Sequence, residues 1–260
     1  MKTKKIHSVL LFIVCPFFIL PLLGQESQGP VLYYAEDMLV KPSRVAEFKE
    51  AIKKFVKIYA ENEVEYRWDT YQTDDFHFYF TIPMKNYEDV GSYFAGGEEL
   101  IGKIEKEELE KLNKLVYGSI DSYQLGLYYY RPDLSYIPEK YAASDQESAY
   151  LQWSWFYIFP EKQIQIEEIA SKWVEEYKSE NISMPYYVWT GHIGGELPMY
   201  LYVWVANDQE DFQDGMAEIN QKLGEKASGL RQQTFDIVKR MEIKRGWSLP
   251  GLSYIPEISQ

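Results

Sequence analysis

The feature that most constrains this chain is an internal repeat. The hexapeptide LSYIPE occurs at 134–139 and again at 252–257, a spacing of 118 residues. At that spacing, apolar positions match over about 31–138 and 149–256 although identities have drifted, as expected where a buried face is maintained. Two copies of this length are domain-sized units and exclude a solenoid, which needs shorter and more numerous repeats.

Both copies have the same order of expected elements. Aromatic and branched runs at 31–40 and 150–159 predict strands, and apolar residues at helical spacing predict amphipathic helices at 42–62 and 160–181. Hairpins are expected next, at 64–82 and 184–206. Helical regions follow at 87–117 and 209–240, the first of them interrupted at Gly96-Gly97. The last strands are expected at 122–130 and 241–247. This is the β-α-β-β-α-β plan of an α+β, ferredoxin-like unit, with helices on one face of a four-stranded antiparallel sheet.

The other face of each sheet carries many of the chain's 23 tyrosines and seven tryptophans. A large apolar patch left in water is unfavourable. We therefore expect two tandem ferredoxin-like repeats, 25–140 and 141–260, that pack sheet to sheet as an intramolecular pseudo-dimeric barrel.

Residues 1–24 have the pattern of a secretory signal peptide. Three lysines precede an apolar run at 9–23, and Gly24 offers a small residue for cleavage. The alternative is an uncleaved anchor, but the run is shorter than the roughly 20 apolar residues of a spanning helix and contains two prolines. The only cysteine, Cys15, lies inside this segment, so the mature chain has no disulfide. We expect export, to the periplasm or the outside of a bacterial cell.

The charge of the mature chain restricts its partners. Without the signal lysines it has 24 basic and 40 acidic residues. Such a surface repels phosphate backbones and anionic lipid heads. We therefore expect neither a nucleic-acid partner nor a membrane partner after cleavage.

The element order, the repeat and the aromatic strands together resemble the dimeric α+β barrel superfamily, which includes NIPSNAP, antibiotic-biosynthesis monooxygenase and chlorite-dismutase-like families. The resemblance covers nearly the whole mature chain and concerns architecture. It implies two facing sheets and the option of a pocket between sheet and helices. It also implies that LSYIPE is an exit arm after each last strand, with Tyr136 or Tyr254 packed on the neighbouring half. With two histidines left after cleavage, the haem site of some relatives is not expected here.

The candidate ligand-binding residues lie on the polar faces of the first hairpin. If these faces point into the barrel, they form one lumenal cluster of Arg67, Asp69, Tyr71, His77 and Tyr79. Arg67 would orient a carboxylate or enolate, His77 would move a proton, and Asp69 would fix the imidazole tautomer. The alternative is that these residues only satisfy one another or face solvent.

The second copy contributes aromatic candidates at the corresponding place, namely Tyr200, Tyr202 and Trp204. Any site is therefore one-sided, and the different length of the second hairpin leaves open by one residue which strand face these side chains occupy. His192 and Glu196 at a Gly-rich hairpin tip are too few for a metal site, and no metal or cofactor is expected. The sequence also has no phosphate-binding Gly loop, nucleophile elbow, HExxH or CxxC motif.

Three functions remain open from these observations. The first is an exported binding protein whose aromatic lumen holds a small apolar or aromatic molecule. The second is a cofactor-independent monooxygenase or isomerase on the same scaffold. The third is a structural or interaction protein in which the aromatic faces are only the core between the repeats. The internal pseudo-dimer also leaves room for association into a homo-oligomer.

Overall fold

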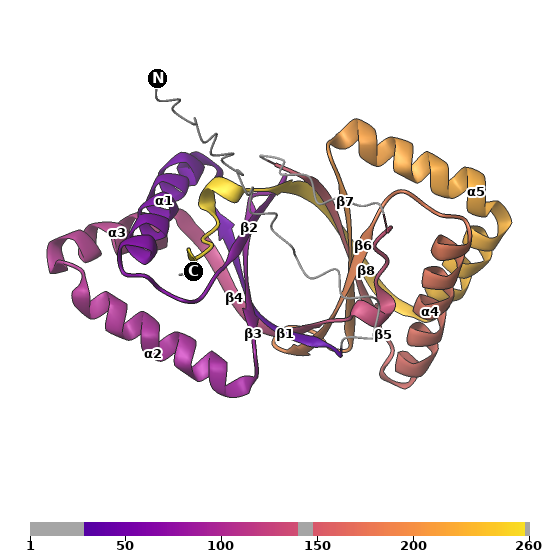
Figure 1. Ribbon diagram of the computed structural model, residues 1–260, viewed down its shortest axis with the longest axis horizontal. Helices are drawn as coiled ribbons and strands as arrows, with labels where there is room; N and C mark the ends of the chain where they lie inside the picture. The colour runs from indigo at the N-terminus through magenta and orange to yellow at the C-terminus, as the bar shows by residue number, and fades with distance from the viewer. Residues whose placement is uncertain (1–28, 140–147, 258–260) are drawn as a thin grey trace, which may run out of the picture.

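The computed structural model describes residues 29–139 and 148–257 and shows two halves with the same order of strands (Figure 1). Before its last strand the first half has two helices where the second half has one. The elements of the first half are β1 (Val31–Val40), α1 (Val45–Glu61), β2 (Asp69–Thr73), β3 (His77–Met84), α2 (Tyr87–Lys103), α3 (Lys106–Ser119) and β4 (Ile120–Tyr130). Those of the second half are β5 (Tyr150–Ile158), α4 (Gln163–Ser179), β6 (Tyr186–Ile193), β7 (Met199–Ala206), α5 (Gln209–Phe235) and β8 (Val238–Ser248). The predicted signal peptide and the predicted boundary at 140/141 lie outside the described residues.

The eight strands form one closed antiparallel barrel in the order β1-β3-β2-β8-β5-β7-β6-β4. Each half supplies a four-stranded ferredoxin-like sheet. The halves are joined by β2 with β8, where Tyr71 pairs with Ser248, and by β4 with β6, where Tyr130 pairs with Trp189. Closure removes the exposed strand edges that isolated sheets would present. The predicted tandem barrel is confirmed.

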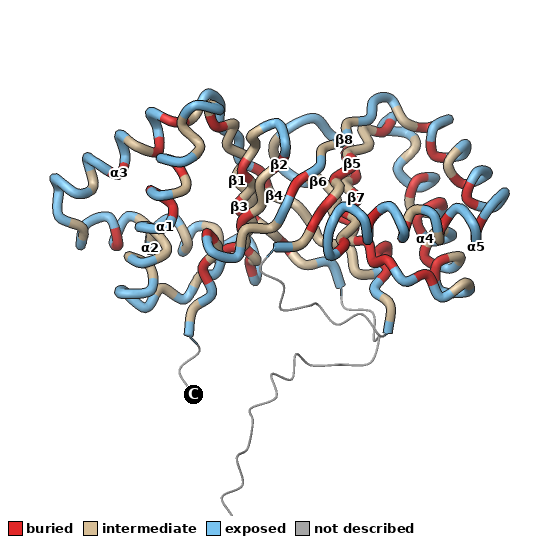
Figure 2. Tube along the Cα trace, turned by 90° about the horizontal axis from the view of Figure 1, so that it is seen from above, coloured by how far each residue is buried: buried red, intermediate tan, exposed pale blue. Residues whose placement is uncertain are grey.

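Helices cover the outside of each sheet, and Figure 2 shows buried segments where they meet. In β3 the alternate residues Phe78, Phe80 and Ile82 are buried in one cluster with Phe48 and Ile52 of α1. This is the helix-facing row that the alternation of β3 predicts. A separate cluster in the second half joins α4 and α5 to β5, β6 and β7.

Side chains fill the lumen around Trp153. Leu151, Trp153 and Val203 are buried there, and the rings of Tyr71 and Tyr79 each lie 6.0 Å from that of Trp153. The lumen is therefore a third packed core that holds the halves together. Much of the aromatic surplus of the sequence serves this purpose.

The repeated LSYIPE segments are crossed arms, which confirms their predicted role. After β4, Tyr136 forms a bridge with Tyr186 of the second half, and its hydroxyl donates to the Ile182 carbonyl at 2.7 Å. After β8, Tyr254 forms the equivalent bridge with Trp68 of the first half, and its hydroxyl donates to the Val64 carbonyl at 2.8 Å. Each half thus ends on its neighbour, and the same hexapeptide satisfies the same environment twice.

Two boundaries differ from the prediction. The helix expected to break at Gly96-Gly97 continues through them and ends at Lys103, because a helical glycine costs only about 1 kcal/mol and does not stop a helix. The strand expected from 64 begins only at Asp69. Arg67 therefore precedes the strand on which it was placed.

The helices differ between halves in how closely they pack. α2 and α5 both begin at a capping side chain, Asn86 and Asp208, that accepts a hydrogen bond from the backbone three residues on. In α2 only Leu100 is buried and α3 buries three residues, whereas α5 buries seven. At Gly215, α5 approaches Met184 so closely that a Cβ there would lie 2.8 Å from the Met184 sulfur. The first sheet is therefore less completely covered than the second.

Among the described residues, no helix combines the length and the apolarity that crossing a lipid bilayer requires.

Candidate functional site

The predicted lumenal cluster is divided along the barrel. Arg67 donates twice to Asp69, at 2.8 and 2.9 Å. Asp69 lies opposite Thr81, four residues along β3 from His77, or about 13 Å at ~3.3 Å per residue. The expectation that Asp69 orients His77 is therefore wrong.

His77 has other partners at its own end of the lumen. Its Nδ1 lies 2.6 Å from the Asp37 carboxylate, and its Nε2 lies 3.8 Å from Asp75. Lys244 of β8 donates to Asp75 at 2.8 Å, and the Tyr79 ring stacks on the imidazole at 6.0 Å. Hydrogen bonds to Lys244 and Thr73 hold the pKa of Asp75 below its ordinary value, against its partial burial. Every charge in this group has a partner, so the group joins the halves and presents no unmatched group to a ligand.

Tyr200, Tyr202 and Trp204 do not face the lumen. Tyr200 and Tyr202 are buried in the helix-side core of the second half, and Trp204 packs against it. Tyr202 pairs with Ser154 as Phe80 pairs with Glu36, so Tyr202 is the counterpart of the helix-facing Phe80. The second hairpin is longer by four residues, an even number that keeps the alternation, and Leu201, Val203 and Val205 face inward. Their assignment to one site with His77 is corrected accordingly.

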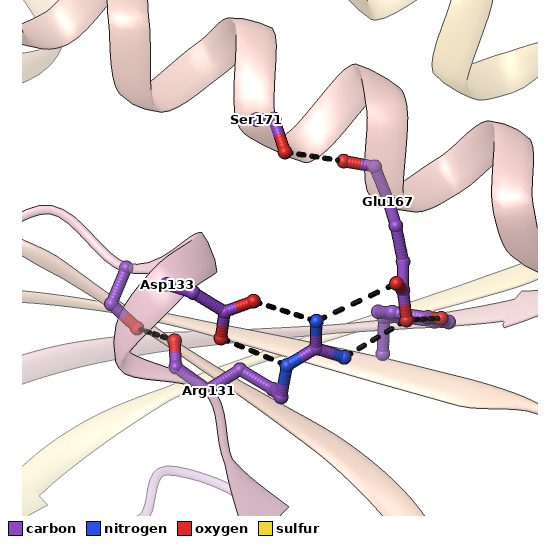
Figure 3. A network of polar contacts seen from close by, with 6 residues as sticks. Arg131, Asp133, Glu167 and Ser171 are labelled. Carbon is purple, nitrogen blue, oxygen red and sulfur yellow. Dashed lines mark hydrogen bonds and ion pairs between the residues drawn. The ribbon is translucent and has the colours of Figure 1, made fainter. Parts of the chain in front are cut away.

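Tyr200 instead joins a polar network between the halves. Figure 3 shows Arg131, Asp133 and Glu167 of this network. The Arg131 guanidinium, which follows β4, binds Asp133 in a two-pronged contact and donates to Glu167 of α4 at 2.8 Å. The Tyr200 hydroxyl donates to the same Glu167 oxygen at 2.9 Å. Hydrogen bonds from Arg131 hold the pKa values of Asp133 and Glu167 below their ordinary range. This arginine fixes the first arm to the second half.

A pocket lies on the helix side of the first half. Its volume is 320 Å³, and it lies between the end of α1, the segment after it and the second half of α2. We call it the wedge pocket. Its lining residues are Tyr59, Asn62, Val64, Glu65, Tyr66, Tyr93, Gly96, Gly97, Glu99, Leu100 and Lys103.

Beside this pocket the first sheet carries a charge on its apolar face. Glu36 of β1 is half-buried, and its cross-strand neighbours are Phe80 of β3 and Leu125 of β4. One carboxylate oxygen accepts a hydrogen bond from the Tyr34 hydroxyl at 3.0 Å. Burial raises the pKa of Glu36, and the hydrogen bond from Tyr34 offsets only part of that rise.

Four phenols from four elements surround this carboxylate. Burial raises the pKa values of Tyr34, Tyr59, Tyr93 and Tyr123, and the nearby charge of Glu36 raises each of them further. We call these four tyrosines and Glu36 the Glu36 cluster. Tyr59 and Tyr93 also line the wedge pocket, so the carboxylate and the pocket are neighbours across these two rings.

The sequence analysis did not identify Glu36, although the sequence holds a signal for it. In VLYYAEDMLV the alternate residues Leu32, Tyr34, Met38 and Val40 form an apolar row, and Glu36 is the single acid in that row. A lone carboxylate on the buried face of a strand is a candidate for function because burial perturbs its pKa.

His192 lies away from both sites, on an exposed bulge of β6. Its Nε2 is 2.6 Å from the Tyr87 hydroxyl, which is in turn 2.6 Å from that of Tyr129. Glu196 pairs with Lys239 and Arg240 and does not approach His192 as a second ligand. Within the described parts of the chain, no three histidine, cysteine or acidic side chains form a metal-binding group.

The sequence matches no known protein family and no curated protein. Solved structures match the fold. An anthrone oxidase-like protein superposes with a TM-score of 0.59 at 10% identity, over 84% of this chain and 91% of that one. A provisionally assigned monooxygenase from Lactobacillus acidophilus superposes with a TM-score of 0.55 at 8% identity, over 88% of this chain and 97% of that one. Chlorite dismutase from Candidatus Nitrospira defluvii superposes with a TM-score of 0.50 at 11% identity, over 85% of this chain and 92% of that one.

The chain has the dimeric α+β barrel fold. The resemblance drawn from the sequence is confirmed for the fold. Sequence identities of 8 to 11% show a shared fold and nothing more.

Within this dimeric α+β barrel, the candidate site belongs to one half. The residue that corresponds to Glu36 at the repeat spacing is Ser154, which is buried in the second half. There α5 packs on the sheet through Phe212, Ile219 and Leu223. The two halves therefore share the scaffold, and only the first has the half-buried carboxylate.

Proposed function

We propose that this chain is an exported protein that binds a small apolar or aromatic molecule in the wedge pocket. The pocket itself carries the proposal. Its 320 Å³ is in the range of small-molecule sites, and the rings of Tyr59, Tyr66 and Tyr93 offer apolar faces with hydroxyls at their edges. The lumen, the site expected from the sequence, is occupied by its own side chains.

Two glycines of α2 allow a direct test of the pocket. Gly97 lines it, and a Cβ added there would meet no atom within 4 Å. A leucine side chain at this position would start from an open Cβ and extend into ligand space, and leucine favours the helix over glycine by up to about 1 kcal/mol. Gly91 lies in the same helix, is equally open and does not line the pocket. The variant Gly91→Leu is the matched control for Gly97→Leu.

The experiment is a thermal-shift screen with small aromatic molecules, followed by native mass spectrometry of the hits. We expect at least one class to raise the melting temperature of the wild type and of Gly91→Leu, and not that of Gly97→Leu. The proposal fails if no class stabilises the wild type, or if all three proteins respond equally.

Export is a separate part of the proposal and depends on residues 1–24, which the structure does not describe. Sequencing the N-terminus of protein recovered from the periplasm or the medium of a bacterial host should show that this segment has been removed. A full-length chain retained in the cytosol would contradict it.

A second candidate function is cofactor-independent monooxygenation or isomerisation. Glu36 favours it, because a carboxylate whose pKa is raised by burial can accept a proton from an acidic C–H or a phenol nearer neutral pH. Two similar structures are described as oxidase-like or monooxygenase proteins. Oxygen uptake with anthrone as the probe tests it: turnover by the wild type should be lost in Glu36→Gln, and absence of turnover in the wild type rejects this probe reaction.

A further inference from the structure

We infer that the wedge pocket is a site for an organic cation, with an ammonium head against the faces of its tyrosine rings and the charge of Glu36 behind these rings. The inference rests on the proposed binding function and names the ligand class for it.

The first step is the unmatched charge. One oxygen of Glu36 accepts from Tyr34, and no group in the described chain donates to the other oxygen. No lysine, arginine or histidine of the described residues forms an ion pair with Glu36 either. Glu36 is only partly buried between Phe80 and Leu125, and its second oxygen is not enclosed by the protein. The fold itself does not need a charge there, because the second half has Ser154 at the equivalent position.

The second step is the arrangement of aromatic rings around that charge. The Tyr34 ring lies 5.6 Å from that of Tyr93 and 5.3 Å from that of Phe94, and Tyr93 lies 5.3 Å from Tyr66. These rings form a continuous wall from β1 to the wedge pocket. Aromatic faces carry partial negative charge and attract cations, and clusters of such rings bind quaternary ammonium groups.

The third step is the charge at the mouth of the pocket. The pocket lining includes Glu65, Glu99 and Lys103, and Lys103 is paired with Glu99 at 2.8 Å. Lys49, on α1, lies over the Phe78 ring at 5.8 Å from its centroid and not against Glu36. The charges around the site therefore sum to negative, which disfavours an anionic ligand and favours a cation.

The test compares two ligands of the same shape and different charge. Choline has a quaternary ammonium head, and 3,3-dimethyl-1-butanol replaces its nitrogen with carbon. We expect isothermal titration at pH 8 to show that choline binds the wild type about tenfold more tightly than the neutral alcohol, which corresponds to a cation–π and charge contribution of usual size. In Glu36→Gln this ratio should fall towards one.

The matched control is Asp37→Asn, which removes the next carboxylate of the same strand. Asp37 contacts His77 on the lumenal face, so this variant should keep the preference for choline. Equal binding of the two ligands by the wild type, retention of the ratio in Glu36→Gln, or no choline binding overturns the inference. If neutral aromatic molecules still stabilise the wild type and not Gly97→Leu, the proposed binding function stands and only the preference for a cation is rejected.

Discussion

Glu36 and Asp37 are adjacent in β1, and their carboxylates lie on opposite faces of the sheet in different electrostatic settings. Asp37 points into the barrel and meets His77 at 2.6 Å. Glu36 points to the helices and meets only a phenol. The barrel therefore gives one of two neighbouring acids a histidine partner and leaves the other with a single phenol.

The stability of the protein should depend on Glu36 in a predictable direction. Because burial raises its pKa in the folded state, Glu36 binds its proton more tightly when folded, and its contribution to stability falls as pH rises through the window between the two pKa values. Glu36→Gln should be more stable than the wild type at neutral pH, and the difference should shrink on acidification. Urea midpoints of both proteins at several pH values measure this, and a constant difference would contradict it.

The packed lumen predicts a large cost for truncation at its centre. Trp153 is buried among Tyr71, Tyr79 and Val203, so Trp153→Ala should destabilise the fold by about 3 to 5 kcal/mol. Any ligand bound in the wedge pocket should bind the folded variant as it binds the wild type. Denaturant titration checks the first statement and calorimetry the second. A small cost would mean that the lumen is loosely filled.

The arginine between the halves predicts an acid-sensitive contribution. The Arg131 side chain is only 16% exposed, but its partners Asp133 and Glu167 are about two-fifths exposed and partly screened. Arg131→Met should cost about 1 to 2 kcal/mol at neutral pH. Both acids have lower pKa values in the folded state than their ordinary values near 4, so this contribution to stability is fully present above about pH 4. It is lost as the pH falls through the lower pKa values of the folded state.

The measurement is the unfolding free energy of wild type and Arg131→Met at pH 7 and at pH 3, and the difference between them should be smaller at the lower pH. Lys239→Met, which removes an exposed pair with Glu196, serves as the comparison and should change little at either pH. A cost for Arg131→Met that does not depend on pH would assign the effect to packing.

The crossed arms predict equivalent losses at two distant positions. Tyr136→Phe and Tyr254→Phe each remove a hydroxyl that donates to a backbone carbonyl of the other half, so each should lower the unfolding free energy by about 1 kcal/mol. The exposed Tyr117 offers a control, since Tyr117→Phe should be neutral. If the arm variants behave like that control, the hexapeptide is not held by these bonds.

Particular residues show how far sequence reasoning extends here. The apolar row Phe78, Phe80 and Ile82 was predicted to face the helices, because alternation along one strand is local. Tyr200, Tyr202 and Trp204 were assigned to the wrong face, because the strand that Tyr202 pairs with was not known from the sequence. Pairing with Ser154 makes Tyr202 the counterpart of the helix-facing Phe80. His77 was found without its partner, since Asp37 is 40 residues away and becomes adjacent only when β1 pairs with β3.

The sequence by itself determined the duplicated βαββαβ plan, the closed barrel and the role of the repeated arm, because periodicity and repetition are properties of the chain read in order. Only the tertiary structure decided where an empty space remains. Closure of the barrel brought the lumenal rings into contact and left no open site in the lumen. On the helix side, α2 buries a single residue, and the wedge pocket remains beside the first sheet and Glu36. Such a space depends on how closely whole elements approach one another, and no local pattern encodes that distance.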